Sequence, residues 1–318
     1  MSAQPIHSQS IPPLISFILP VFDVPAELVK ACIQSILLLP ISSEQREIIV
    51  VDDGNAVPVC QLISEFTSSV HIIRQVNAGL SAARNAALDC AQGQYIQFVD
   101  ADDMLLVKGY TQCLKLLDQQ KPDMIMFRFR HHQNEKTFSI KLLGPMTGTQ
   151  MLLRHNLRAS AWSYIFKREI LGELRFIPDL FHEDEAFTPL LVLRAHSLYI
   201  TRIPAYYYRQ RPQSIMSDTA ATHIDRRLAD QMTIIVSLRQ EANQLARQEH
   251  DALSRRVAQL TMDLIYNTWK LTHSPKRIRR LLLRLRKERL YPLPGKCYTA
   301  KYTIFRLLIN SISFVAGQ

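Results

Sequence analysis

Short apolar runs alternate along the first hundred residues with segments whose apolar side chains recur at helical spacing. Four of the runs have the length and composition of buried strands: residues 14–19, 47–51, 70–74 and 95–99. The segments between them have helical periodicity or an alanine-rich composition, at residues 25–39, 57–66 and 81–91. Strands and helices that alternate at this spacing predict a parallel sheet joined by right-handed crossovers. We therefore expect an α/β fold with a Rossmann-like, mostly parallel sheet flanked by helices.

The alternation continues less regularly to residue 218 and then gives way to a helical region. Further strands are expected at residues 123–130, 138–143, 161–166 and 198–202. Further helices are expected at residues 107–119, at 149–155, and from within residues 181–187 to Arg194. Beyond Thr219 the pattern predicts long helices at residues 220–249 and 251–271, and a third helix opened by Pro275.

Charge is distributed unevenly over the 318 residues, whose formal net charge is +10. Residues 1–218 carry 20 Lys and Arg against 21 Asp and Glu, whereas residues 219–318 carry 18 against 7. This change in composition predicts two domains, residues 1–218 and a basic, α-helical C-terminal region at residues 219–318. No nucleic-acid-binding motif accompanies the basic region, so a nucleic-acid partner is not expected.

The helix that begins at Pro275 is amphipathic and strongly basic. Its apolar side holds Ile278, Leu281, Leu282 and Leu285, and its opposite side holds Arg277, Arg280, Arg284 and Lys287. This pattern is typical of helices that lie on an anionic membrane surface. It also fits a helical subdomain that caps the core and leaves its arginines in solvent. A second apolar segment, residues 303–315, is too short to span a bilayer.

Cysteine usage and the N-terminal residues indicate the compartment. The five cysteines are odd in number and form no C-x-x-C pair, which favours reduced thiols over a disulfide framework or a zinc site. The N-terminal residues lack the basic start and apolar stretch of a signal peptide. We therefore expect a cytoplasmic location, with peripheral contact to the inner face of the cytoplasmic membrane as a further possibility.

Three carboxylates follow the apolar run at residues 95–99, namely Asp100, Asp102 and Asp103. Carboxylates crowded at the end of a buried strand repel one another, and a hard divalent cation removes that cost. Mg²⁺ and Mn²⁺ favour carboxylate oxygens and keep positions open for substrate phosphates. The sequence thus predicts a metal held by Asp102, with Asp100 reaching either the metal or a ribose. A solvated acidic turn is the commoner outcome for an isolated D-x-D.

Four polar or aromatic residues fall at the carboxyl ends of the predicted strands, where open α/β sheets bind ligands. These residues are Phe22, Asp53, Asn77 and Asp100. Phe22 offers a flat face for a base, and Asp53 can accept from an N–H on a pyrimidine edge.

The Gly79 loop leads into a helix N-terminus that suits phosphate, and Arg84 adds a cation one turn further on. Each residue alone has an ordinary structural explanation, as core, ion pair or cap. Their common register favours a ligand site.

Four motifs carry a resemblance to a known family: I-L-P-V-F-D, I-I-V-V-D-D-G, N-A-G-L-S-A-A-R-N and F-V-D-A-D-D. Residues 14–106 resemble the N-terminal half of the inverting family-two glycosyltransferases with an A-type fold, of the type that makes bacterial polysaccharides. The resemblance implies that residues 1–218 bind a nucleotide-sugar, with Pro20 among the contacts. Two positions depart from the family, which usually has Tyr at Phe22 and Ser at Asn55; these departures bear on which base is bound.

Two later segments also resemble the family. Glu183 and Asp184 match its acceptor-site Glu-Asp pair, which implies that Asp184 takes the proton from the acceptor hydroxyl. Glu183 and Glu185 are the alternatives for that base. Arg209 and Ser214 match a Y-x-x-R…S-I loop that folds over the donor diphosphate.

The resemblance implies a metal-dependent inverting glycosyltransferase that uses Mn²⁺ or Mg²⁺. Its donor would be a UDP-sugar, and its acceptor a glycan or lipid-linked glycan in cell-surface polysaccharide synthesis. The alternative is a catalytically inactive scaffold whose basic C-terminal helices bind anionic membrane or nucleic acid.

Overall fold

The computed structural model describes residues 12–132, 141–210 and 220–315. The chain forms two compact units, each built from several segments. Unit 1 comprises residues 1–143, 162–173 and 199–209, and unit 2 comprises residues 144–161, 174–198 and 210–318. The predicted domain boundary near residue 218 assigned nucleotide-sugar binding to residues 1–218. The two compact units are defined by their internal contacts alone, so this assignment stays a prediction.

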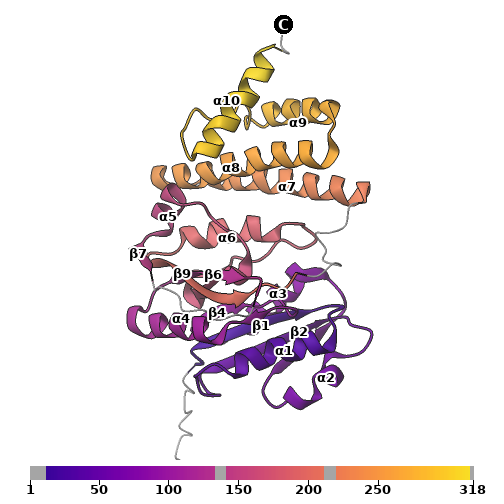
Figure 1. Cartoon of the computed structure of the whole chain (residues 1–318), viewed down its shortest axis with the longest axis vertical. Helices are drawn as coiled ribbons and strands as arrows, with labels where there is room; N and C mark the ends of the chain where they lie inside the picture. Colours follow the sequence, from indigo (N-terminus) through magenta and orange to yellow (C-terminus); the bar gives the residue numbers. More distant parts are fainter. Residues whose placement is uncertain (1–11, 133–140, 211–219, 316–318) are drawn as a thin grey trace, which may run out of the picture. The chain divides into compact units, whose positions relative to one another are not determined.

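Unit 1 is built on a sheet, several of whose strands are labelled in Figure 1. The strand order is β3-β2-β1-β4-β8-β6-β9-β5. The first four strands are β1 (Ile15–Val21), β2 (Arg46–Asp53), β3 (His71–Gln75) and β4 (Tyr95–Phe98). They pair in parallel, with β1 between β2 and β4. All seven residues of β1 are buried, as its continuous apolar run predicts.

The second half of the sheet is antiparallel. Its strands are β5 (Met104–Leu105), β6 (Met124–Arg130), β8 (Tyr164–Lys167) and β9 (Leu198–Tyr207), and β7 (Leu142–Met146) pairs with β9. The pairs β4–β8, β6–β8 and β5–β9 all run antiparallel. The predicted α/β fold with flanking helices and a helical C-terminal region is therefore confirmed, but its sheet is mixed. Only the first four strands alternate with helix-containing connections, so periodicity did not give the direction of the later strands.

Helices flank this sheet in unit 1. They are α1 (Ala26–Leu37), α2 (Val59–Leu62), α3 (Gly79–Cys90) and α4 (Val107–Gln120). Helix α1 starts directly after Pro25 and buries Val29, Cys32, Ile33 and Ile36 in the core shared with β1 and β2. Helix α3 packs on β1, β2 and β3. The helix expected at residues 57–66 is wrong in its extent, since it is the single turn α2 followed by a 3₁₀ turn, η1 (Ser64–Phe66).

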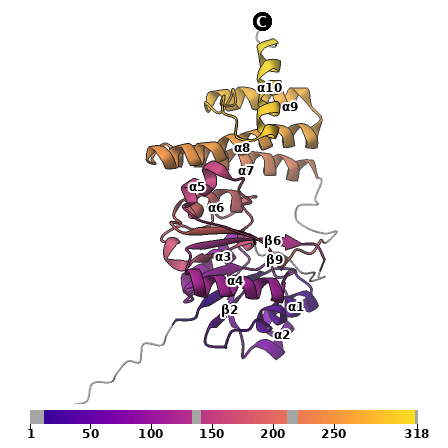
Figure 2. The same cartoon turned by 60° about the vertical axis from the view of Figure 1, so that its left-hand side comes forward.

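Unit 2 consists of helices with a core of their own. They are α5 (Gly148–Arg154), α6 (Glu183–Leu193), α7 (Ala221–Ala242), α8 (Arg247–Thr272), α9 (Pro275–Lys287) and α10 (Ala300–Val315). Helices α7 and α8 pack side by side (Figures 1 and 2). The buried Arg255 of α8 donates to Leu152 O and His155 O, which satisfies carbonyls at the end of α5.

The apolar side of α9 faces this core. Leu285 is fully buried, and Ile278, Leu281 and Leu282 pack against the same cluster. The leucine stripe thus stabilises unit 2, and its Leu285 is closed to lipid, whereas Ile278, Leu281 and Leu282 stay partly exposed. Among the described residues, no helix combines the length and apolarity needed to cross a bilayer.

Candidate functional site

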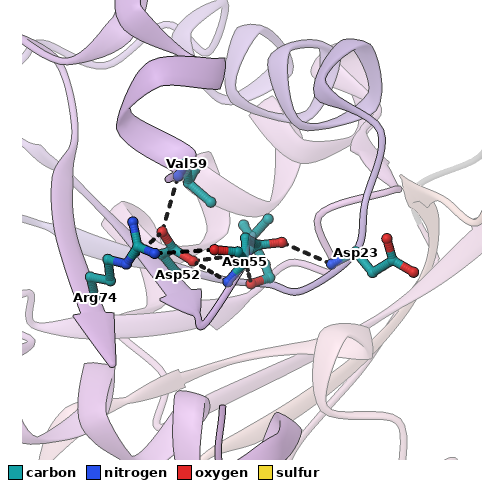
Figure 3. Close-up of polar contacts among 6 residues, drawn as sticks. Asp23, Asp52, Asn55, Val59 and Arg74 are labelled. Carbon is teal, nitrogen blue, oxygen red and sulfur yellow. Dashed lines mark hydrogen bonds and ion pairs between the residues drawn. The ribbon is translucent and has the colours of Figure 1, made fainter. Parts of the chain in front are cut away.

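The loops after β1 and β2 are joined by a hydrogen-bond network around Asn55 (Figure 3). Its Nδ2 donates to Val21 O at 2.9 Å and to Asp52 Oδ1 at 2.7 Å, and its Oδ1 accepts from Asp23 N at 2.9 Å. A seryl hydroxyl has a single O–H donor and cannot serve both acceptors. Asn55, one of the two departures from the family pattern, is therefore the residue that fixes the chain on either side of Phe22.

Asp52 is the carboxylate that accepts hydrogen bonds within the same network. It is buried and accepts from Asn55 N and Val59 N, and Arg74 lies 3.7 Å away. Burial acts to raise the pKa of Asp52, but the hydrogen bonds from Asn55 and Val59 hold it below its ordinary value. Asp52 is thus a structural carboxylate that stays ionised to organise the loop.

Asp53 is turned toward the loop that precedes α3. Its Oδ1 accepts from Gln75 Nε2 at 2.7 Å and from Ala78 N at 2.9 Å, and its Oδ2 accepts from Gly79 N at 2.9 Å. The prediction that the backbone N–H groups of the Gly79 loop bind phosphate is therefore wrong for Ala78 and Gly79. The carboxylate of Asp53 already accepts from these two N–H groups and so satisfies the N-terminus of α3.

The residues predicted to touch a nucleotide differ in accessibility. Phe22 is 53% exposed directly after β1, and Asn77 is exposed beside Gly54, whose φ is +80°. A Cβ at Gly54 would stand 2.6 Å from Asn77 N, so glycine is required where these two loops meet. Pro20 is buried within β1 and supports the site only through the backbone.

The D-x-D turn follows β4 and is held by two arginines. Arg84 is 1% exposed and its Nη2 lies 3.2 Å from Asp100 Oδ1, while its guanidinium lies over the ring of Phe98. Arg84 therefore acts on Asp100 from beneath and does not face solvent, which corrects its predicted place beside the ligand. The side chain of Asp100 remains 29% exposed and open to a ligand.

Arg209, predicted to lie in a loop over the donor diphosphate, contacts the D-x-D turn. Its Nε donates to Asp102 O at 2.8 Å, and its backbone N donates to Asp103 Oδ1 at 2.7 Å. Ser214, the other predicted member of this loop, lies outside the described residues.

Asp103 is the residue whose role the sequence did not reveal. It is buried, and burial together with the charge of Asp100 raises the pKa of Asp103 to about 8. Asp103 Oδ1 accepts from Arg209 N and so connects the turn to the residues that follow β9. The adjacent D-D pair was the available signal, because two neighbouring carboxylates of a turn rarely share one environment.

The carboxylates at this turn fit a divalent cation that is completed by substrate. Among the described residues, no group of three His, Cys, Asp or Glu side chains is placed to hold a metal. Mg²⁺ in nucleotide-dependent enzymes is held by one or two carboxylates and the substrate phosphates. Asp100 and Asp102 are the two carboxylates of this turn that are not buried, and they would fit that role.

The first turn of α6 carries the predicted acceptor-site acids within unit 2. Asp184 Oδ2 accepts from Ala161 N at 3.0 Å, and Glu183 starts the helix. Glu185 forms an ion pair with Arg256, a buried residue of α8. The alternative that Glu185 serves as the base is disfavoured, because its carboxylate is committed to this pair.

Trp162 belongs to the core of unit 1. It lies in the 3₁₀ turn η2 (Ala161–Ser163), ahead of the strand predicted to hold it. Its ring stacks on Tyr206 at 4.5 Å and on Tyr208 at 5.4 Å, and it is buried.

Comparison with known proteins identifies the family to which this sheet and its D-x-D turn belong. The model of "Glycosyl transferase family 2" matches residues 16–175. The chain belongs to glycosyl transferase family 2. It is therefore a glycosyltransferase, and the alternative of a catalytically inactive scaffold loses its basis.

Curated relatives resemble part of the chain. It is 27% identical over 69% of its length to an uncharacterized glycosyltransferase EpsJ of Bacillus subtilis, covering 67% of that protein. It is 29% identical over 63% of its length to glycosyltransferase GlyA of Streptococcus pneumoniae, and 25% identical over 62% to the minor teichoic acid biosynthesis protein GgaB of Bacillus subtilis. The matches cover only 31% of GlyA and 23% of GgaB.

Solved structures share the fold over nearly the whole chain. The structure of S. aureus TarS 1-349 in complex with UDP-GlcNAc has a TM-score of 0.63 at 18% identity, and covers 96% of this chain and 92% of that one. Mannosyltransferase PcManGT from Pyrobaculum calidifontis, in complex with GDP-Man and Mn²⁺, has a TM-score of 0.57 at 13% identity, with 96% and 88% coverage. At these identities the likeness establishes the fold.

Proposed function

We infer that this glycosyltransferase moves a sugar, with inversion, from a UDP-linked donor to a hydroxyl of a glycan or lipid-linked glycan in cell-surface polysaccharide synthesis. The observation that carries the proposal is the D-x-D turn, where Asp100 and Asp102 lie between Arg84 and Arg209. Nucleotide-sugars and Mn²⁺ in the fold neighbours support the donor class and a divalent cation, and either UDP or GDP donors occur among them.

Donor binding is assigned to the residues at the strand ends of unit 1. Phe22 stacks on the base, and Asn77 contacts the nucleoside from the neighbouring loop. Asp53 positions that loop, and its Oδ2, with one protein donor, keeps an acceptor position for a pyrimidine N–H. Arg209 donates to the diphosphate, since a guanidinium fork matches phosphate oxygens.

Arg84 is a positioning residue, because its cation holds the carboxylate of Asp100 toward the donor. Asp100 and Asp102 would hold Mn²⁺ or Mg²⁺, which neutralises charge on the departing diphosphate when it is bound.

Asp184 is assigned as the general base that takes the proton from the acceptor hydroxyl. The N–H of Ala161 orients one of its oxygens. The ion pair with Arg256 holds Glu185, which makes Glu185 less suited to act as the base. Glu183 stays as the alternative base. An orienting donor of this kind fixes a carboxylate without neutralising it.

Two amide variants test these roles separately. Asp102→Asn is expected to lose the increase in UDP affinity that Mn²⁺ gives, as measured by calorimetry with and without metal. Asp184→Asn is expected to bind donor normally and to transfer sugar about 100-fold more slowly in a single turnover. An unchanged metal effect in Asp102→Asn overturns the metal site. Normal transfer by Asp184→Asn moves the base to Glu183, and lost donor affinity makes Asp184 a structural residue.

A donor screen tests the nucleotide. Thermal shift with UDP- and GDP-sugars in the presence of Mn²⁺ is expected to show stabilisation by UDP-sugars, because bound ligand raises the unfolding temperature. Stabilisation by GDP-sugars alone contradicts the assignment of a pyrimidine to the site at Asp53.

A further inference from the structure

A hollow of about 590 Å³ opens among α8, α9 and α10 in unit 2. Of its twelve lining residues, ten are uncharged and mostly apolar, and the two charged ones are Arg279 and Arg286 of α9. This volume lies within the range of pockets that bind small apolar ligands. The hollow borders the helical core of unit 2, because Ile278 and Leu282 of α9 line it and also pack against that core, while the buried Leu285 is not in its lining.

The mouth of the hollow exposes large apolar side chains. Trp269 is 47% exposed, Leu283 50% and Leu308 62%. Ile304 and Leu307 extend the exposed surface along α10, at the i, i+3, i+4 spacing of a helix stripe with Leu308. A contiguous exposed apolar surface of this kind marks an interaction site rather than ordinary surface variation.

The helix that carries this stripe is held in place by its other side. Tyr291 Oη donates to Ile309 O at 2.8 Å, and Asn310 exchanges two hydrogen bonds with the backbone of Leu293. The buried Tyr302 donates to Pro294 O at 3.1 Å. Helix α10 is therefore fixed to unit 2 by its opposite side, and its apolar stripe remains exposed in that fixed position.

Positive charge surrounds the hollow. Helix α9 contains seven Lys or Arg residues and no acid: Lys276, Arg277, Arg279, Arg280, Arg284, Arg286 and Lys287. All seven are exposed, and in the described part of the chain only Arg277 among them has a carboxylate partner, Asp225. The hollow thus has two cations in its lining, Arg279 and Arg286, on a helix whose six cations other than Arg277 have no carboxylate partner among the described residues.

We propose that this surface of α8, α9 and α10 binds an anionic phospholipid bilayer. Lipid hydrocarbon enters the hollow beside Trp269, Leu283 and Leu308, and Arg279 and Arg286 at its rim bind headgroup phosphates. Trp269 and Tyr266 have the amphipathic rings that favour the boundary between headgroups and hydrocarbon.

Charge and apolarity together select the bilayer over other occupants. Nucleic acid would satisfy the cations but has no hydrocarbon to fill the hollow. A second copy of the chain would bring the same positive surface against this one, and like charges repel. Acyl chains with phosphate headgroups match both features.

The test measures binding of the full chain to vesicles of phosphatidylglycerol and phosphatidylcholine, by sedimentation. Lys276→Gln, Arg279→Gln and Arg286→Gln combined are expected to weaken binding on the order of 100-fold, at about fivefold for each cation. Arg277 is left unchanged, because it holds Asp225 within unit 2. The matched control replaces three exposed cations of unit 1, Lys115, Arg128 and Arg202, by Gln and is expected to bind like the parent.

Insertion is tested with the natural fluorescence of the chain, which has two tryptophans. Lipids brominated on the acyl chains are expected to quench Trp269, and quenching should disappear in Trp269→Phe, because Trp162 is buried in unit 1. Leu283→Gln with Leu308→Gln removes hydrocarbon contact at exposed positions that contribute little to folding, and is expected to weaken binding without changing its salt dependence.

Four results overturn the proposal. They are equal sedimentation of the parent and the α9 variant, absence of quenching, binding that is indifferent to Leu283 and Leu308, and a self-association in ultracentrifugation that the two leucine changes abolish. The last result would assign the surface to a second copy. None of these measurements involves sugar transfer, so the outcome is independent of the proposed reaction.

Discussion

Asn55→Ala is the change that most directly tests how the site is organised. The substitution removes the two bonds from Nδ2 to Val21 O and Asp52 Oδ1, and the bond from Asp23 N to Oδ1. A neutral hydrogen bond contributes about 1 kcal/mol and one to a charged group about 2 kcal/mol. Water can replace part of the bond at Asp23, which is exposed, so we expect the free energy of unfolding of unit 1 to fall by about 3 kcal/mol.

The two tryptophans allow this loss to be assigned to one unit. Trp162 belongs to unit 1 and Trp269 to unit 2. In a Trp269→Phe background, urea unfolding monitored through Trp162 reports unit 1 alone. A loss of about 3 kcal/mol should shift the urea midpoint by about 1–3 M, given the usual dependence of unfolding free energy on urea.

Two matched variants define what the network contributes. Asn55→Ser keeps one hydroxyl donor and should recover about half of the loss. Asn77→Ala removes an exposed asparagine from the adjoining loop, so its stability should match the parent while its affinity for UDP falls. Equal midpoints for Asn55→Ala and the parent, or an equal shift in Asn77→Ala, would refute this account of the loop.

The pH dependence provides a second check with a defined sign. The pKa of Asp52 is lowered in the fold, so its contribution to stability is present above its ordinary value of 3.8 and is lost as the pH falls below that value. Because Asn55 is among the causes of the lowering, the difference in unfolding free energy between the parent and Asn55→Ala should shrink as the pH falls below 3.8.

Three further predictions concern other contacts. Arg209→Ala should weaken UDP binding about 10- to 100-fold with and without Mn²⁺, because it removes charge-assisted bonds and leaves the carboxylates in place; an effect seen only with Mn²⁺ would contradict this. Arg256→Met should lower the unfolding free energy of unit 2, measured in urea, by about 2 kcal/mol, because it leaves Glu185 without its cation; the loss is moderate because Glu185 is partly exposed to water. Arg247 is exposed, so Arg247→Met should leave the unfolding free energy unchanged. Burial and then Arg227 lower the pKa of His182, so the unfolded chain binds a proton that the folded chain does not, and stability is lost as the pH falls below 6.5; His182→Asn should flatten that loss in thermal unfolding between about pH 7 and about pH 5.

The first four strands could be predicted because each contains a short apolar run and alternates with a helix or a single helical turn, although β3 is not buried. The residues at their carboxyl ends were placed correctly for the same reason, since parallel strands end at one edge. The pairing of Arg84 with Asp100 was not predictable in this way. Periodicity puts Arg84 on a helix near the site but does not say whether its side chain points up toward a ligand or down beneath the turn.

The role of Asp53 shows a different limit of the sequence. A carboxylate and a helix N-terminus were each recognised as partners for a nucleotide, but the structure pairs them with each other. A donor and an acceptor that both suit a ligand also suit one another when the loop between strands is short. Motifs therefore identify the groups at a site more reliably than the partner of each group.

The three acids that open α6 show how the structure separates neighbours that the sequence cannot. Consecutive residues of a helix project about 100° apart, so Glu183, Asp184 and Glu185 must face three different surroundings. Glu185 meets Arg256 and is held as an ion pair, whereas the N–H of Ala161 donates to one carboxylate oxygen of Asp184. A carboxylate in an ion pair with a buried arginine must give up that pair before it can take a proton from a substrate hydroxyl. The contact with Arg256 therefore disfavours Glu185 as the proposed proton acceptor, and it leaves Asp184 as the assigned base with Glu183 as its alternative.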